Sequence, residues 1–313
     1  MRITSNMTAN NAIYNLQKAQ TTLNNLTELT TSEQNINQPS DNPAATNTLL
    51  NINDSLNAIN QYSTNITNAT TVLNVTNDAL TGISSSIAQA QQVMSTMTSG
   101  STDPSVRQSA YDQLATIKQQ IIDYGNTQSG NTYVFGGTDS STPPFSVVGA
   151  TNTYNGNSTQ SSVEVTTNSY QVVNITGDRL LGLPGASSSG PPIPSPSYGS
   201  TDILGTLDNL MAAVGNNATP SNVANIQQYS SALDAGATQI NNATVDVAAR
   251  MQRLTTMSTM NTNSQNTLQN VVGNIQSVDL ATVGTELSQQ QTAYQAALSA
   301  TAQISKMSLL NYL

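Results

Sequence analysis

An apolar residue at every seventh position, sustained over more than forty residues, constrains this chain more than any other feature of its sequence. The segment between Pro43 and Pro104 contains no proline, so nothing in it interrupts a helix. A helix from Pro43 to about Thr98 would be roughly 80 Å long at 1.5 Å per residue. The adjoining positions, from Leu56 to Gln91, are mostly polar, which predicts a helix in a bundle rather than a two-stranded coiled coil. The repeat consists of Ile52, Ile59, Ile66, Leu73, Leu80, Ile87 and Met94.

Heptad spacing also marks both ends of the chain. A first helix is expected from about Ser5 to Glu33, and its alanine-rich seam would let a partner helix approach closely. Further helical segments are expected around 203–214 and 220–261, and a last helix is expected from near Gln265 to the end. Since apolar stripes stand at both termini, the economical arrangement packs the terminal helices on each other. The first seam consists of Ala9, Ala12, Leu16, Ala19, Leu23 and Leu26.

The middle of the chain has a different composition. Thirteen of the 18 glycines lie between Gly125 and Gly215, after a helix expected from Pro104 to about Asn126 with Asp103 as its N-cap. Strand-like runs at 132–135, 162–167 and 170–176 follow, and 185–200 is a proline-rich linker. The predicted fold is mainly α with a small β insert (α+β): long N- and C-terminal helices form a coiled-coil or helical-bundle rod, with a β-rich domain inserted in mid-chain.

These elements suggest a domain scheme. Residues 1–41 form an N-terminal coiled-coil helix that pairs with 280–313, and residues 42–131 and 200–279 form a helical rod. Residues 132–199 form the β-rich insert and its proline-rich linker. The insert has turn residues at both edges, so it is expected to be dispensable for assembly.

Composition excludes several classes of function. Only 8% of the residues are charged, the formal net charge is −9, and the three lysines stand alone. Nucleic acid and anionic membranes both require clustered basic residues, so neither is an expected partner. The chain has no Cys and no His, which removes Cys and His nucleophiles, His bases and every metal site built from Cys or His. No signal peptide or membrane-spanning run is recognised, which fits a cytoplasmic protein or one exported with its N-terminus uncut.

Few residues could carry chemistry. A Ser–Lys dyad would need Lys18, Lys118 or Lys306, and all three are expected to be solvated on helices. The acid pairs Glu28/Glu33 and Asp202/Asp208 are interpreted as polar faces or caps. We therefore expect no catalytic, cofactor-binding or metal-binding residues and no cofactor, and a carboxylate hydrolase hidden in the insert is the remaining enzyme hypothesis.

Both ends of the chain resemble the flagellin family. At the N-terminal end the resemblance rests on Asn10, Asn11, Leu16 and the segment 36–44, Ile-Asn-Gln-Pro-Ser-Asp-Asn-Pro-Ala. At the C-terminal end it rests on the segments 250–254, 279–281 and 286–291. The two matches cover about the first 100 and the last 70 residues. The sequence departs from the family at 32–36, where the usual basic residues are missing.

Within the family, two segments resemble the hook-associated protein 3 type more than filament flagellin. They are the entry to the β insert, 133–137 with 142–146, and the tail Ser-Leu-Leu-Asn-Tyr-Leu at 308–313. The resemblance implies a structural subunit at the hook–filament junction, exported largely unfolded through the flagellar type III channel to the extracellular flagellum. Its implied partners are copies of itself in a ring, the preceding hook-associated junction protein, flagellin and an export chaperone.

The terminal helices would make the assembly contacts. A helix with an alanine-rich seam is marginal alone and becomes stable when a lattice buries its stripe. Two other functions remain open: filament flagellin itself, and a secretion needle-tip or adhesin-like binding module. The predicted interface consists of Leu16, Leu23, Leu26, Leu280, Val283, Leu287, Tyr294, Leu298, Ile304 and Leu310.

Overall fold

The computed structural model describes residues 5–98, 103–149, 151–183, 198–215 and 220–310. These residues form two compact units. The terminal unit contains 1–58 and 263–313, and the central unit contains 59–262. The domain scheme expected from the sequence remains a prediction. The helices are α1 (Ser5–Ser32), α2 (Pro43–Thr98), α3 (Pro104–Gly125), α4 (Gly177–Leu181), α5 (Ile203–Gly215), α6 (Pro220–Gln276) and α7 (Leu280–Leu310).

Helix α2 begins and ends where the sequence predicts. The Asn42 side chain accepts a hydrogen bond from the Ala45 amide at 3.1 Å, and Pro43 supplies the first helical residue. Six of the seven repeat residues are buried, and Ile59 is half-buried. The adjoining positions from Leu56 to Gln91 are half-buried or exposed, as their mostly polar character indicates. A second buried stripe, which was not predicted, lies three residues after each repeat residue from Ile66 onward. This second buried stripe consists of Ala69, Thr76, Ile83, Ala90 and Met97.

Helix α6 runs unbroken from Pro220 to Gln276, so the break expected near Gln265 is wrong. The helix ends at Gln276, and residues 277–279 separate it from α7. The expectation that Val245 lies on the packed face of the helix is also wrong, because its side chain is 60% exposed. One stripe of buried residues on α6 recurs every seven positions: Ile226, Leu233, Ile240, Val247, Leu254 and Asn261.

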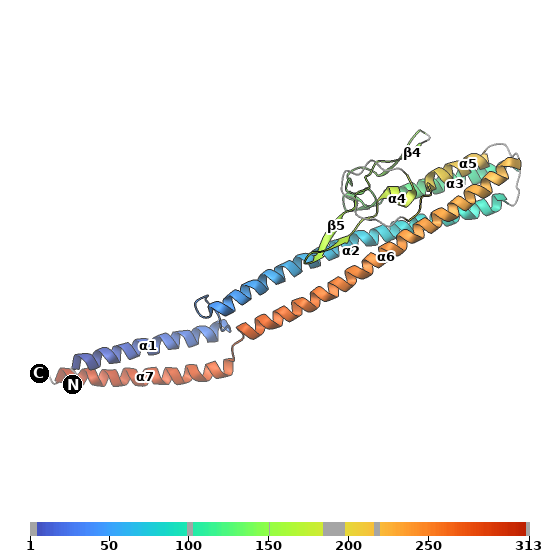
Figure 1. Ribbon diagram of the computed structural model, residues 1–313. Helices are drawn as coiled ribbons and strands as arrows, with labels where there is room; N and C mark the ends of the chain where they lie inside the picture. Colours follow the sequence, from blue (N-terminus) through green and yellow to red (C-terminus); the bar gives the residue numbers. More distant parts are fainter. Residues whose placement is uncertain (1–4, 99–102, 150, 184–197, 216–219, 311–313) are drawn as a thin grey trace. The chain divides into compact units, whose positions relative to one another are not determined.

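The middle of the chain forms three separate antiparallel hairpins (Figure 1). The run expected as a strand at 132–135 is extended only at its first two residues, and the hairpin after Phe145 was not predicted. Helix α3 packs against α5. The hairpins are β1 (Gln128–Ser129) with β2 (Thr132–Tyr133), β3 (Phe145–Val148) with β4 (Thr151–Tyr154), and β5 (Ser162–Thr166) with β6 (Ser169–Val172).

The insert shares one hydrophobic core with the long helices. Phe135, Phe145 and Val165 are fully buried in the same cluster as Leu80 of α2 and Leu233 of α6. Removing the insert would therefore expose apolar surface on the helices. The shared core argues against the expectation that the insert is dispensable.

Candidate assembly surfaces

Helices α1 and α7 form an antiparallel pair within the terminal unit (Figure 1). The side chains along α1 that are half-buried recur at heptad spacing and include Ala12, Leu16 and Ala19. The Gln290 side-chain amide donates to the Ala19 carbonyl at 3.1 Å. A hydrogen bond from a side chain of α7 to the main chain of α1 requires the two helices to approach closely, and the small alanine side chains of α1 allow this.

The residues predicted as an interface divide into three groups. One group is half-buried in the pair, and it does not present its full side chains to another subunit. Leu280 and Leu298 are each 44% exposed, and their spacing of 18 residues places them on one face of α7. The side chains of Ile304 and Leu310 lie outside the described part of the structure. The half-buried group is Leu16, Leu23, Leu26, Val283, Leu287 and Tyr294.

Helix α1 also exposes apolar side chains that were not predicted from the sequence. Tyr14 is 66% exposed and Met7 is 58% exposed, and they lie two turns apart on the side of α1 opposite the alanine seam. Ile13 is 50% exposed. Tyrosine is enriched at the energetic centres of protein interfaces. The signal in the sequence was a second seven-residue spacing, Met7 to Tyr14, on the side of the helix opposite the alanine seam.

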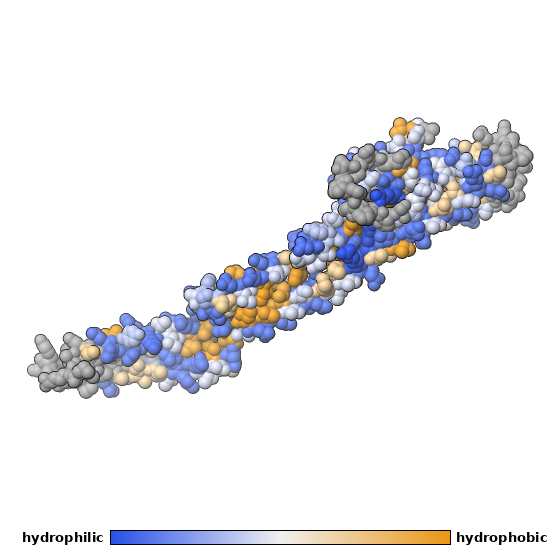
Figure 2. Space-filling view, viewed as in Figure 1, coloured by the Kyte–Doolittle hydropathy of each residue, from blue (hydrophilic) through white to orange (hydrophobic). Residues whose placement is uncertain are grey.

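A further apolar area lies where the first turns of α2 run beside the last turns of α6 (Figure 2). Leu49 and Ile52 are buried there, but their neighbours are not fully covered. Incompletely covered apolar area of this kind is typical of surfaces that associate. The incompletely buried apolar residues in this part of the terminal unit include Leu50, Leu56, Leu268, Val271, Val272 and Ile275.

The two non-helical segments of the terminal unit, which follow α1 and α6, are joined by main-chain hydrogen bonds. Gln34 and Ser277 form an antiparallel bridge, and the Asn35 amide donates to the Gln276 carbonyl at 2.8 Å. On the α1 side, the Asp41 carboxylate accepts the Asn37 and Gln38 amides. Each of these two segments therefore stabilises the position of the other.

Helix α7 is capped by Asp279. Its carboxylate accepts the Ala281 amide at 3.0 Å and the Thr282 hydroxyl at 2.8 Å. These hydrogen bonds, that from the Thr282 side chain foremost, hold the pKa of Asp279 below its ordinary value of 3.8.

We expect the start of α7 to fray in acid. Because the folded pKa is lowered, the cap is fully formed above pH 3.8 and is lost as the pH falls through the folded value. NMR signals of the Ala281 and Thr282 amides should shift toward unfolded positions over that range. In Asp279→Asn, which keeps a cap but no charge, the acid-dependent shift should disappear. An unchanged titration in that variant would contradict the assignment.

In the central unit, polar side chains of α6 hold the middle of the chain through its main-chain atoms. The Gln239 amide donates to the Leu180 carbonyl at 2.9 Å, and that of Asn261 to the Val165 carbonyl at 3.0 Å. Both side chains are buried. The Asn242 side-chain amide donates to the Tyr198 carbonyl at 3.1 Å. We call this row the polar ladder; it consists of Gln239, Asn242, Asp246, Arg250 and Asn261.

Arg250 is the most enclosed charge of the ladder. Its guanidinium donates to the Asn174 carbonyl at 2.8 Å and pairs with Asp246 at 2.6 Å. The Tyr198 hydroxyl donates to the same Asp246 carboxylate at 2.6 Å, and burial raises the pKa of Tyr198. Arg250 lies three residues after Val247 and four before Leu254, inside the buried seam. An arginine at such a seam position was the sequence signal for this role.

The expectation that Lys118 is solvated is wrong. Its side chain is 12% exposed and its ammonium pairs with Asp208 of α5 at 2.6 Å. Asp202 is a cap as expected, because its carboxylate accepts the Gly205 amide.

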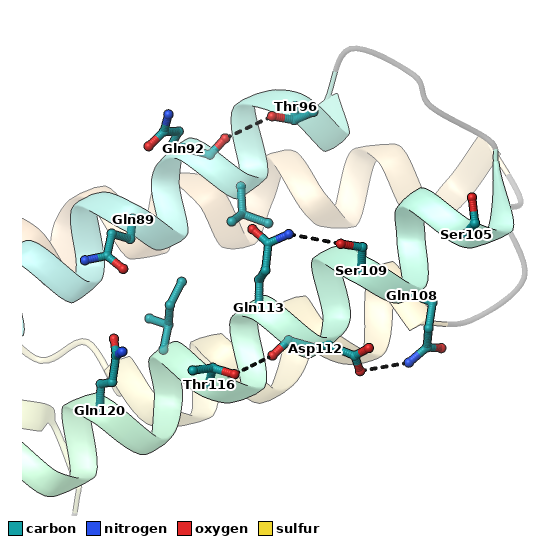
Figure 3. Close-up of a pocket in the computed structure, with 12 residues that line it drawn as sticks. Gln89, Gln92, Thr96, Ser105, Gln108, Ser109, Asp112, Gln113, Thr116 and Gln120 are labelled. Atoms are coloured by element: carbon teal, nitrogen blue, oxygen red, sulfur yellow. Dashed lines mark hydrogen bonds between the residues drawn. The ribbon is translucent and has the colours of Figure 1, made fainter.

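The largest of the described recesses is a groove of about 890 Å³ between α2 and α3 (Figure 3). Side-chain amides from both helices line it, among them Gln89 and Gln92 of α2 and Gln113 of α3. Asp112 is the sole ionisable group among its lining residues, and it accepts a hydrogen bond from Gln108. A nucleophile paired with a base, the arrangement that covalent catalysis requires, is missing from this lining.

Metal binding and membrane insertion find no support in the described ranges. No three Asp or Glu residues in them gather closely enough to hold a metal ion. No described helix combines the length and apolarity that crossing a bilayer requires.

Comparison with known proteins gives two family matches. Residues 3–139 match the family model of the bacterial flagellin N-terminal helical region, and residues 230–313 match that of the bacterial flagellin C-terminal helical region. The two matched segments hold 137 and 84 residues, so together they cover 221 of the 313 residues. No curated protein sequence matches the chain.

Solved structures share the fold. A flagellar hook-associated protein from Vibrio parahaemolyticus is 23% identical with a TM-score of 0.66, over 76% of this chain and 100% of that one. Flagellar hook-associated protein-3 from Legionella pneumophila is 18% identical with a TM-score of 0.62, over 72% and 98%. The flagellar junction protein FlgL from Legionella pneumophila is 18% identical with a TM-score of 0.58, over 73% and 99%.

Proposed function

The chain belongs to the bacterial flagellin family, whose members are structural proteins of the flagellum, and from that premise we propose that it is a subunit of the hook–filament junction. The observation that carries the proposal is the antiparallel α1/α7 pair, which leaves Tyr14 exposed on α1 and leaves Leu280 and Leu298 exposed on one face of α7. A ring of identical subunits needs two different complementary surfaces on each copy. An apolar face on each helix of the pair supplies candidates for both.

The junction role is supported over the filament role by two observations. The three solved structures described above are junction or hook-associated proteins, and nearly all of each one is matched. The tail at 308–313 resembles the same branch of the family. Under this proposal the subunit contacts copies of itself, the preceding hook-associated junction protein and flagellin. It leaves the cell unfolded by the flagellar type III route, with an export chaperone as a further partner, and it functions outside the cell.

An assembly assay distinguishes junction from filament. Purified subunit is added to isolated hooks that carry the preceding junction protein, and flagellin is added afterwards. The expected result is a short, self-limiting layer on the hook and filament growth only in its presence. Long filaments from this subunit alone would identify it as a filament flagellin. Failure to bind hooks at all would favour the needle-tip or adhesin-like alternative.

A further inference from the structure

Asp208 bridges two side chains that belong to different elements of the central unit. One carboxylate oxygen accepts a hydrogen bond from the Lys118 ammonium of α3 at 2.6 Å. The other accepts a hydrogen bond from the Asn152 side-chain amide of β4 at 2.6 Å. A single carboxylate thus holds an amine beside a carboxamide, 34 positions apart in the chain.

The surroundings of the three groups limit their contact with water. The Lys118 side chain is 12% exposed and that of Asp208 is 30% exposed. The side-chain carbonyl oxygen of Asn152 is buried and accepts no hydrogen bond. Because α3 and α5 pack directly on each other, the amine and the carboxylate are held rather than brought together by chance.

We propose that Lys118 and Asn152 react to form an intramolecular amide bond, with Asp208 as the proton carrier. Asp208 first takes a proton from the Lys118 ammonium, which leaves a neutral amine. The amine nitrogen attacks Cγ of Asn152, and the carbonyl electron pair moves to Oδ1, while the protonated Asp208 stays beside Nδ2, the leaving nitrogen. Oδ1 is the oxygen that has no donor before the reaction.

The intermediate then collapses. The bond between Cγ and Nδ2 of Asn152 breaks as Asp208 gives the leaving nitrogen the proton that it took from Lys118. Asp208 then passes a second proton from the attacking nitrogen to the released ammonia. The products are a Lys118–Asn152 amide and one ammonium ion, and the Asp208 carboxylate is regenerated. The reaction needs no oxidant and no cofactor. Positioned groups of this kind gain rate from proximity and from general acid–base catalysis.

The bond would join α3 to β4 covalently in a chain that has no cysteine. A disulfide is not open to this sequence, and an amide between folded elements forms only after the fold has brought the two side chains together. Under the proposed function, such a bond would form after export and would not hinder passage of the unfolded chain.

Intact-mass spectrometry of the folded full-length subunit tests the proposal. The wild-type chain is expected to lack the mass of one ammonia molecule, and a protease digest is expected to yield one branched peptide containing Lys118 and Asn152. Lys118→Arg and Asp208→Asn, with folding checked by circular dichroism, should keep the full mass. Asn152→Asp should lose water in place of ammonia.

One other reaction of this chain releases ammonia and must be separated. Asn155 precedes Gly156, a sequence that favours cyclisation of the asparagine to a succinimide. Asn155→Ala removes that route and should leave the mass deficit of the wild type unchanged. A full-mass wild-type chain after prolonged incubation in native buffer overturns the proposal. Persistence of the ammonia loss in Lys118→Arg does so as well.

Discussion

Leu287→Asp is expected to abolish attachment of the subunit to the hook while leaving its secretion normal. Leu287 is half-buried on the face of α7 that packs with α1. An unpaired carboxylate in an apolar contact costs several kcal/mol or forces the group to take up a proton. The variant should therefore be found free in the medium, together with unassembled flagellin. The measurement compares the amount secreted with the amount attached to hooks.

Gln291→Asp is the matched control for that variant. Gln291 lies one turn further along α7 and is exposed, so the same charge placed there should cost little. Retention of Leu287→Asp inside the cell would mean that an export chaperone binds this face of α7 before the subunit assembles. Normal attachment would remove the face from the assembly mechanism.

Arg250→Met is expected to destabilise the central unit by about 3–5 kcal/mol, the usual cost of breaking a buried ion pair by removing one partner. The substitution leaves Asp246 without its cation and the Asn174 carbonyl without its donor. For a unit of this size, the loss should lower the thermal midpoint by about 10 °C. Calorimetry of the full-length subunit provides the measurement.

Arg253→Met provides the comparison for Arg250. Arg253 lies one turn further along α6, is exposed and makes one long hydrogen bond, 3.3 Å to the Ser169 hydroxyl. Its substitution should change stability by less than about 0.5 kcal/mol. If both variants melt at the same temperature as the wild type, the polar ladder does not hold the middle of the chain.

The sequence predicted the long helices well because their signals are local and repeated. Pro43 and Asn42 define the start of α2, and the seven-residue repeat from Ile52 to Met94 defines its buried face. The break between α6 and α7 was predicted near Gln265, which is wrong, because no proline marks the true break at 277–279. The true break lies between Gln276 and Leu280, and its signal is the Asp279 cap of α7, which is weak in a sequence rich in polar residues.

The interactions between distant segments could not be predicted from the sequence. Lys118 was expected to be solvated because helical spacing places it but does not reveal Asp208 and Asn152 opposite it. The exposure of Tyr14 could not be predicted because α1 carries apolar residues at seven-residue spacing on two sides, and spacing alone does not show which side is covered. Local periodicity reports which residues share a face, whereas the partner of that face depends on the whole fold.

The polar ladder of α6 removes an ambiguity that a perfect repeat creates. Apolar residues spaced by seven fit their partners almost as well after the helix slides by one repeat, about 10 Å. Gln239, Arg250 and Asn261 are instead spaced by eleven, so no such slide superposes them. A slide would place Ala243 or Met257 against the Asn174 carbonyl and leave it unpaired in the interior. The hydrogen bonds between the polar ladder and the middle of the chain can therefore form in only one axial register of α6.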